Sequence, residues 1–127
     1  MGDVWLSRPE LAASSEAGVE AAVDIPADAP WFSGHFPGRP VLPGVVWLYA
    51  AAEVVRENAR RGGRPVEIAG FRNVRFRARV VGAARAVIVV GPAVGARAGE
   101  LRFEVRIDGE PVCRGLIAVR YPAGEGA

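Results

Sequence analysis

A proline-rich segment placed directly before an apolar run constrains the fold of this chain more than any other feature. Residues 31–45 read WFSGHFPGRPVLPGV and contain three prolines, three glycines and His35, the only histidine in the sequence. Proline fixes φ and lacks a backbone N–H, so this segment cannot be a helix or a central strand. We therefore predict a rigid loop between Pro26 and Pro43, and loops of this length in small domains are usually functional.

The loop runs into the one substantial helix that the sequence predicts, Gly44–Arg61. Its apolar residues cover most of the first turns, its second half is amphipathic, and Gly62-Gly63 should end it. The apolar positions are Val45, Val46, Leu48, Tyr49, Ala52, Val55 and Ala59. A helix of this kind should be surrounded by a sheet. The free N–H groups of its first turn, with His35 held nearby by a stiff loop, suggest a general base beside an oxyanion-binding site.

The rest of the chain is typical of antiparallel strands. Alternating or continuous apolar runs predict strands at 18–25, 65–80, 86–90, 100–107 and 111–121. Asp108-Gly109 predicts a two-residue hairpin turn between the last two. Residues 1–17 are weakly patterned, with a short strand expected at Val4–Leu6 and a turn at Ser14-Ser15. One helix and about five strands indicate an α+β fold.

Composition limits the classes of function. The 127 residues suit a single domain spanning 1–127, and no apolar run reaches the roughly 20 residues that a membrane span needs. Without a signal pattern, we expect a cytoplasmic protein. The net charge of +2 is too small and dispersed to indicate nucleic acid, and one histidine with one cysteine provides no metal site. The single cysteine, Cys113, is predicted to be an inert residue of a strand.

Residues 35–45, HFPGRPVLPGV, resemble the signature loop of the hotdog-fold 3-hydroxyacyl-ACP dehydratases of the FabZ/FabA type. The flanking segments 26–32 and 45–48 resemble more closely the dehydratase-like group of aryl polyene pathways. Residues 71–81 resemble the second conserved strand of the family. The resemblance covers most of the chain, about residues 19–121. It implies a curled antiparallel sheet of about five or more strands around one central helix, a homodimer with active sites between protomers, and no bound cofactor.

The resemblance also implies roles for individual residues. His35 corresponds to the base, and the Gly44 N–H to the donor that binds the thioester oxygen. The Val41 carbonyl corresponds to the group that orients the imidazole. The expected substrate-binding residues are Phe32, Phe36, Val41 and Trp47. Phe32, Phe36 and Trp47 either border the acyl channel or pack in the core, and the sequence does not separate the two.

One position departs from the family pattern. The family carries Glu or Asp fourteen positions after the histidine, and this chain carries Tyr49 there. Three interpretations follow. Tyr49 acts as a weaker acid in a dehydratase; the site binds acyl thioesters or catalyses another thioester reaction, such as hydrolysis; or Glu53, one turn further along the helix, supplies the acid. A mixed dimer, in which a second hotdog chain supplies the carboxylate, belongs to the second interpretation.

An arginine-rich strand gives the last candidate surface. Its members are Arg72, Arg75, Arg77 and Arg79, with Arg39 in the loop. Such a stripe is either a solvated face or a docking surface for acyl carrier protein, which is acidic and carries a phosphopantetheine phosphate. The sequence therefore predicts a 3-hydroxyacyl-ACP dehydratase or dehydratase-like protein of fatty acid, aryl polyene or polyketide-type biosynthesis. The alternatives are an acyl-thioester binding module, an inactive partner subunit and a hotdog thioesterase.

Overall fold

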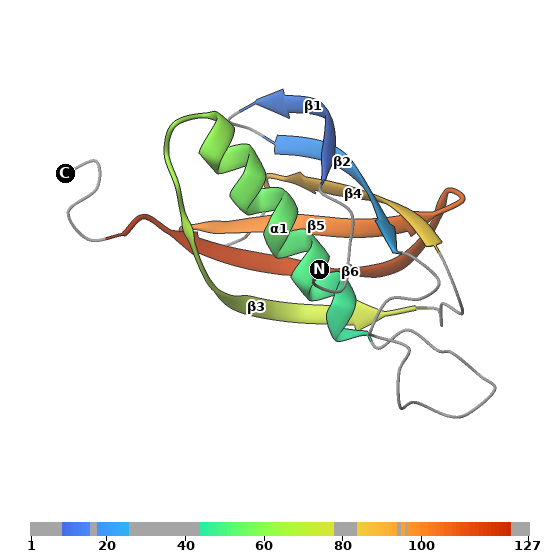
Figure 1. Cartoon of the computed structure of the whole chain (residues 1–127). Coiled ribbons are helices and arrows are strands. Elements are labelled where there is room, and N and C mark those ends of the chain that lie inside the picture. The colour runs from blue at the N-terminus through green and yellow to red at the C-terminus, as the bar shows by residue number, and fades with distance from the viewer. Residues whose placement is uncertain are drawn as a thin grey trace, which may run out of the picture.

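A single long helix lies across one face of a curled antiparallel sheet (Figure 1). The computed structural model describes residues 9–15, 18–25, 44–77, 84–93, 95 and 97–122. Within these ranges the helix is α1 (Val45–Arg61). The strands are β1 (Glu10–Ser15), β2 (Gly18–Ile25), β3 (Glu67–Phe76), β4 (Ala84–Gly91), β5 (Glu100–Ile107) and β6 (Glu110–Arg120). The sheet order is β1-β2-β4-β5-β6-β3, and every neighbouring pair is antiparallel. This arrangement confirms the predicted fold.

The β5–β6 hairpin follows directly from its sequence. Phe103 and Val105 are fully buried against the helix side, while Arg102 and Arg106 are exposed, as the period of two predicts. Asp108 and Gly109 have φ of 52° and 80°, the conformation that a two-residue type I′ turn requires. The expected hairpin is therefore confirmed.

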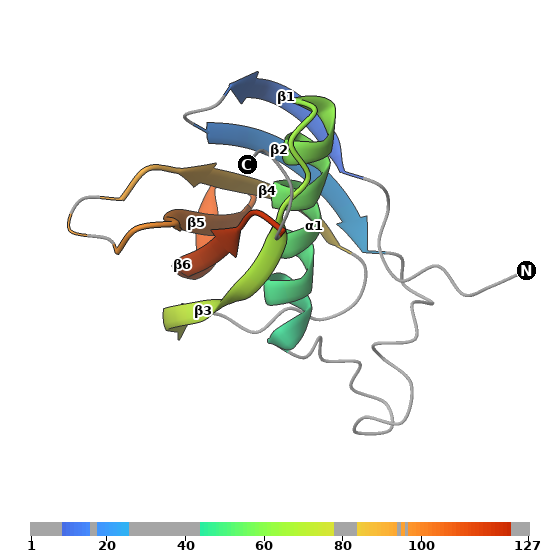
Figure 2. The same cartoon turned by 90° about the vertical axis from the view of Figure 1, so that its left-hand side faces the viewer.

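The helix buries one face and leaves another open. Val46, Trp47 and Val54 are at most 2% exposed and pack into the core, which the sheet closes from one side (Figure 2). Val45 and Tyr49, which lie one turn apart, are 60% and 42% exposed. The expectation that the sheet covers the first turns all round is therefore wrong for this stripe, because the sheet lies against only one side of α1.

Two strands differ from their predictions. Residues 10–15 form β1 and pair with β2, so the turn expected at Ser14-Ser15 is wrong; Val4–Leu6 lies outside the described residues. Strand β3 does not alternate simply, because its register with β6 shifts between Arg72 and Arg75, and Asn73 has a φ of 55°. This irregularity is typical of a β-bulge and changes which residues share a face.

A bidentate ion pair ties β3 to β5 across the intervening strand β6. Arg72 donates from Nε and an Nη atom to Glu100 over 2.9 and 2.8 Å, and the Arg97 N–H donates to the same carboxylate. The Glu100 side chain is 7% exposed. The Arg72 guanidinium, followed by the Arg97 N–H, lowers the pKa of Glu100 to about 2.

This ion pair makes the stability of the fold depend on pH. The folded-state pKa of Glu100 lies below its ordinary value, so the stabilisation is complete above that value and is lost as the pH falls toward 2. We expect Glu100→Gln to lower the urea midpoint at pH 7. The difference in urea midpoint between the variant and wild type should become smaller as the pH falls from 5 to 2.5. Glu67→Gln, which breaks an exposed pair with Arg120, is the control and should change the midpoint little. An equal difference in urea midpoint at pH 7 and at pH 2.5 would contradict this account.

Candidate functional site

The N-terminal end of α1 is a candidate donor site, and no described side chain caps it. The first turn contains no acidic residue, and Gly44 makes no side-chain cap hydrogen bond. The Gly44 carbonyl accepts from the Trp47 N–H over 3.0 Å, but the N–H groups of a first turn have no partner inside their own helix. Such N–H groups, with the positive end of the helix dipole, can bind a carbonyl oxygen that gains negative charge.

Phe76, at the end of the edge strand β3, lies directly against this helix end. A Cβ atom placed on Gly44 would lie 2.8 Å from Cε1 of the Phe76 ring, closer than real contacts allow. The φ and ψ of Gly44, −57° and −31°, are ordinary helical values. A side chain at position 44 would therefore have to displace the exposed Phe76 ring, whereas the backbone conformation accepts any residue.

This contact predicts the effect of a single methyl group. We expect Gly44→Ala to lower kcat/KM for a thioester substrate by about 10²-fold, the scale of losing one oxyanion donor, because the methyl displaces the ring and crowds the N–H. The double variant Gly44→Ala/Phe76→Ala removes the ring and should recover part of that loss. A single variant with wild-type kinetics would contradict the assigned role of Gly44.

Tyr49 lies on the exposed stripe of α1, slightly more than one turn after Gly44. Its hydroxyl is hydrogen-bonded to Glu53, which is the main reason that the pKa of Tyr49 is raised; burial adds to the effect and Arg56 opposes it. Arg56 lies 3.8 Å from the Glu53 carboxylate. The phenol therefore keeps its proton throughout the neutral pH range, but its single O–H donates to the Glu53 carboxylate and can reach a ligand only by leaving Glu53. Tyr49 and Glu53, which the sequence offered as alternatives, form one unit.

The other predicted site residues fall into two groups. Trp47 is 2% exposed and belongs to the core, where the sequence allowed either core packing or channel lining. Six lie outside the described residues: Phe32, His35, Phe36, Arg39, Val41 and Arg79. Their predicted roles stay predictions. Cys113 is fully buried, and burial raises the pKa of its thiol to about 11, which agrees with an inert core residue.

The arginines predicted on β3 also fall into two groups, one ion-paired and one exposed. Arg72 is neutralised by Glu100, whereas Arg75 is exposed and lies opposite Arg114 of β6 in the strand register. Neither Arg75 nor Arg114 has a carboxylate within ion-pair distance in the described part of the chain. Like charges directly opposite each other destabilise a sheet, and on its other side Arg114 lies opposite Glu104 of β5. The sequence could not identify Arg114 as part of this surface, because the pairing depends on the shifted register.

Neither a metal site nor a membrane-spanning helix is found among the described residues. They contain no group of three His, Cys, Asp or Glu side chains that could hold a metal ion. No helix among them is long and apolar enough to cross a membrane.

Comparisons with known proteins identify the family of this chain. The family model of ApeI-like proteins, described as ApeI dehydratase, matches residues 11–116. A 3-hydroxyacyl-[acyl-carrier-protein] dehydratase FabZ from Syntrophomonas wolfei is 32% identical over 97 residues, which is 72% of this chain and 67% of that protein.

Solved structures show the fold alone. The dehydratase heterocomplex ApeI:P from Xenorhabdus doucetiae superposes with a TM-score of 0.65 at 20% identity, covering 89% of this chain and 98% of that chain. A thioesterase from Pseudomonas aeruginosa also superposes, with a TM-score of 0.55 at 16% identity over 90% of this chain and 82% of that chain. Because one fold carries both activities, the reaction must be argued from the family and the site.

Proposed function

Because this chain belongs to the ApeI-like dehydratase family, we propose that it is a cytoplasmic enzyme that eliminates water from 3-hydroxyacyl thioesters. The pathway would be fatty acid, aryl polyene or polyketide-type biosynthesis. The observation that carries the proposal is the start of α1, where the Phe76 ring packs against Gly44, no described side chain caps the helix and the family match includes this segment. This is the geometry that a thioester carbonyl needs for binding and polarisation.

The proposed reaction uses three groups. The imidazole of His35 removes a proton from C2, and the electron pair forms the C2–C3 double bond while the C3–O bond breaks. The Gly44 N–H stabilises the negative charge that develops on the thioester oxygen. The hydroxyl leaves with a proton from Tyr49 as water, and the proton on the imidazolium returns through solvent to the phenolate. No cofactor takes part, because acid, base and oxyanion donor are sufficient.

In this scheme the Tyr49 O–H leaves the Glu53 carboxylate, to which it donates in the structure, and turns to the substrate hydroxyl. Its raised pKa keeps the phenol protonated until that step. A phenol is a weaker acid than the carboxylic acid of the family, so we expect a slower enzyme whose activity persists to higher pH.

A homodimer is the assembly that we propose for this enzyme. Val45, Tyr49 and Phe76 are 60%, 42% and 54% exposed and lie at the helix start and the end of β3, which is an edge strand. Exposed apolar side chains beside an unpaired strand edge favour pairing with a second copy. Such pairing would cover Tyr49 and exclude water from the site.

Acyl carrier protein is the proposed donor of the substrate, and its docking surface would include Arg75, Arg77 and Arg114. The opposed pair Arg75 and Arg114 is tolerated where an acidic partner neutralises both charges. We expect Arg75→Glu/Arg114→Glu to raise KM for acyl-ACP at least tenfold and to leave KM for the matching N-acetylcysteamine thioester unchanged. Arg85→Glu/Arg120→Glu, on β4 and at the end of β6, makes the same change of net charge at other positions and is the control. An equal change with both substrates would contradict docking at this surface.

An inactive acyl-binding partner subunit is the second candidate. It is favoured by Tyr49 in the acid position and by the heterocomplex formed by the Xenorhabdus doucetiae protein of the same fold. Pull-down with the tagged chain from its native host distinguishes the two. The partner function predicts a stoichiometric second hotdog chain with Glu or Asp at the position of Tyr49.

The enzyme function is tested by incubating the purified protein with 3-hydroxyacyl N-acetylcysteamine thioesters of increasing chain length. We expect the enoyl thioester and its absorbance to form without any added cofactor. Release of free thiol with no enoyl product would instead identify a thioesterase and overturn the dehydratase proposal.

A further inference from the structure

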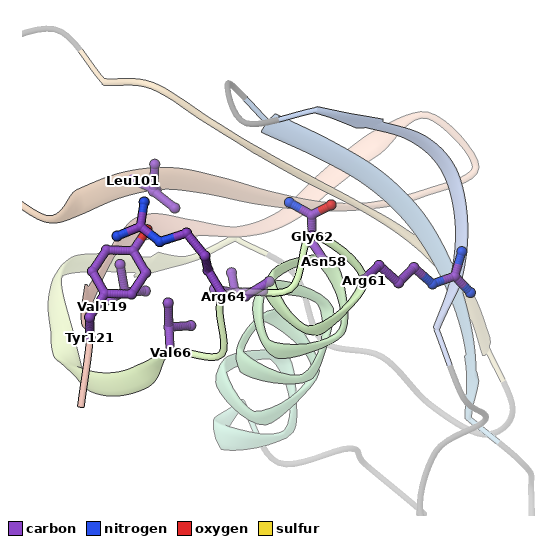
Figure 3. A pocket seen from close by; sticks show the side chains of 10 residues that line it. Asn58, Arg61, Gly62, Arg64, Val66, Leu101, Val119 and Tyr121 are labelled. Atoms are coloured by element: carbon purple, nitrogen blue, oxygen red, sulfur yellow. The ribbon is translucent and has the colours of Figure 1, made fainter. Parts of the chain in front are cut away.

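A cavity of about 520 Å³ opens at the opposite end of α1 from the candidate active site (Figure 3). Its walls come from the last turns of the helix, the turn that follows it, and the strands β5 and β6 with the start of β3. The 17-residue helix is about 25 Å long, so this cavity is a separate place in the molecule. Its volume lies within the range of small-molecule binding sites.

The cavity is apolar over much of its wall. The apolar side chains that line it are Val55, Ala59, Val66, Leu101 and Val119. Most of them are only partly buried and pack around the edge of the core. A ligand with an aliphatic chain would remove this surface from water, which is the main favourable contribution to binding in such a site.

One uncompensated positive charge lies at the rim. The Arg64 guanidinium stacks on the Tyr121 ring, 3.9 Å from its centroid, and has no carboxylate within ion-pair distance among the described residues. Its backbone is fixed, because the Arg64 N–H donates to the Ala59 carbonyl over 3.1 Å. A guanidinium whose face rests on an aromatic ring still presents the N–H groups of its edge, which match a carboxylate.

The neighbouring arginine does not add to this charge. Arg61 also lines the cavity, but its side chain extends away from Tyr121 and Val119 in Figure 3, and its Nε donates to Glu57 over 3.0 Å. The carbonyl end of the helix dipole is also negative on this side. The site therefore favours a ligand with a single negative charge over a phosphate dianion.

From these observations we infer that the cavity binds an aliphatic monocarboxylate of medium chain length, with the carboxylate on Arg64 and the chain along Val55, Val66 and Leu101. A small anion would leave the apolar walls exposed to water. An uncharged chain would leave the Arg64 guanidinium with the Tyr121 ring and no carboxylate among the described residues. The inference does not rest on the proposed function, because binding here needs neither His35 nor turnover.

Isothermal titration calorimetry with octanoate tests the site directly. We expect saturable binding by wild type, at least tenfold weaker binding by Arg64→Gln, and unchanged binding by Arg61→Gln, because the Arg61 Nε donates to Glu57. Acetate and octan-1-ol, which lack the chain and the charge respectively, should bind at least tenfold more weakly than octanoate. Arg64→Lys keeps the charge without the planar fork and should bind at an intermediate level. Circular dichroism establishes that each variant is folded.

Three results would overturn the inference. The first is equal octanoate affinity in wild type and Arg64→Gln, which would place the ligand elsewhere, including the active-site channel. The second is the absence of saturable binding at millimolar octanoate. The third is binding only after truncation at Pro122, which would show that the chain's own C-terminus is the occupant.

Discussion

Replacing His35 with alanine lowers the dehydration rate by about 10²- to 10⁴-fold, the range expected for removing a general base. His35 is the only histidine in the chain, so no second imidazole can take over its role. The measurement is kcat/KM for a 3-hydroxyacyl N-acetylcysteamine thioester, followed by enoyl absorbance. In wild type, the same quantity should fall at low pH as the imidazole becomes protonated.

His35→Gln is the matched control for packing, since its amide can hydrogen-bond but cannot accept the C2 proton at neutral pH. It should be as inactive as His35→Ala while melting at the wild-type temperature. Because the chain has a single imidazole, its pKa can also be read directly by NMR and compared with the kinetic value. Unchanged turnover in both variants would exclude His35 as the base.

Tyr49→Phe should be the next most damaging change, with a fall in kcat of about 10²-fold and a smaller change in KM. The variant removes only the hydroxyl that is hydrogen-bonded to Glu53, and Tyr49 is 42% exposed, so stability should be nearly unaffected. In wild type, activity should persist up to the raised pKa of Tyr49, above the ordinary phenol value of about 10.

Glu53→Gln separates the two members of the pair. It removes the main cause of the raised pKa of Tyr49 but keeps the phenol, so the high-pH limit of activity should move down while kcat falls less than in Tyr49→Phe. If Glu53→Gln were the more damaging variant, Glu53 itself would be the acid. Tyr49→Glu, which restores the carboxylate of the family, should retain or increase activity.

Several parts of this account could be predicted from the sequence. The period of two in β5, the Asp108-Gly109 turn and the glycines that end α1 are local signals, and each is borne out. The helix boundary was correct to one residue, because proline and glycine precede it.

Other features depend on contacts between distant segments. Strand β1 has little apolar pattern of its own and exists through pairing with β2. The opposition of Arg75 and Arg114, the Arg72–Glu100 bridge and the contact of Phe76 with Gly44 depend on the register of β3, which the bulge at Asn73 shifts. The spacing of four residues places Tyr49 and Glu53 side by side on the helix. It does not distinguish a hydrogen-bonded pair from two alternative acids, and the structure shows the pair.

The central claim is that this chain dehydrates 3-hydroxyacyl thioesters by itself, with Tyr49 in place of the carboxylate. The most direct test is a comparison of purified wild type and Tyr49→Phe, each free of other hotdog chains, on the same 3-hydroxyacyl thioester. The account predicts enoyl product from wild type and about 10²-fold less from Tyr49→Phe. A silent wild type, with activity appearing only in Tyr49→Glu or after a carboxylate-bearing partner is added, would contradict it.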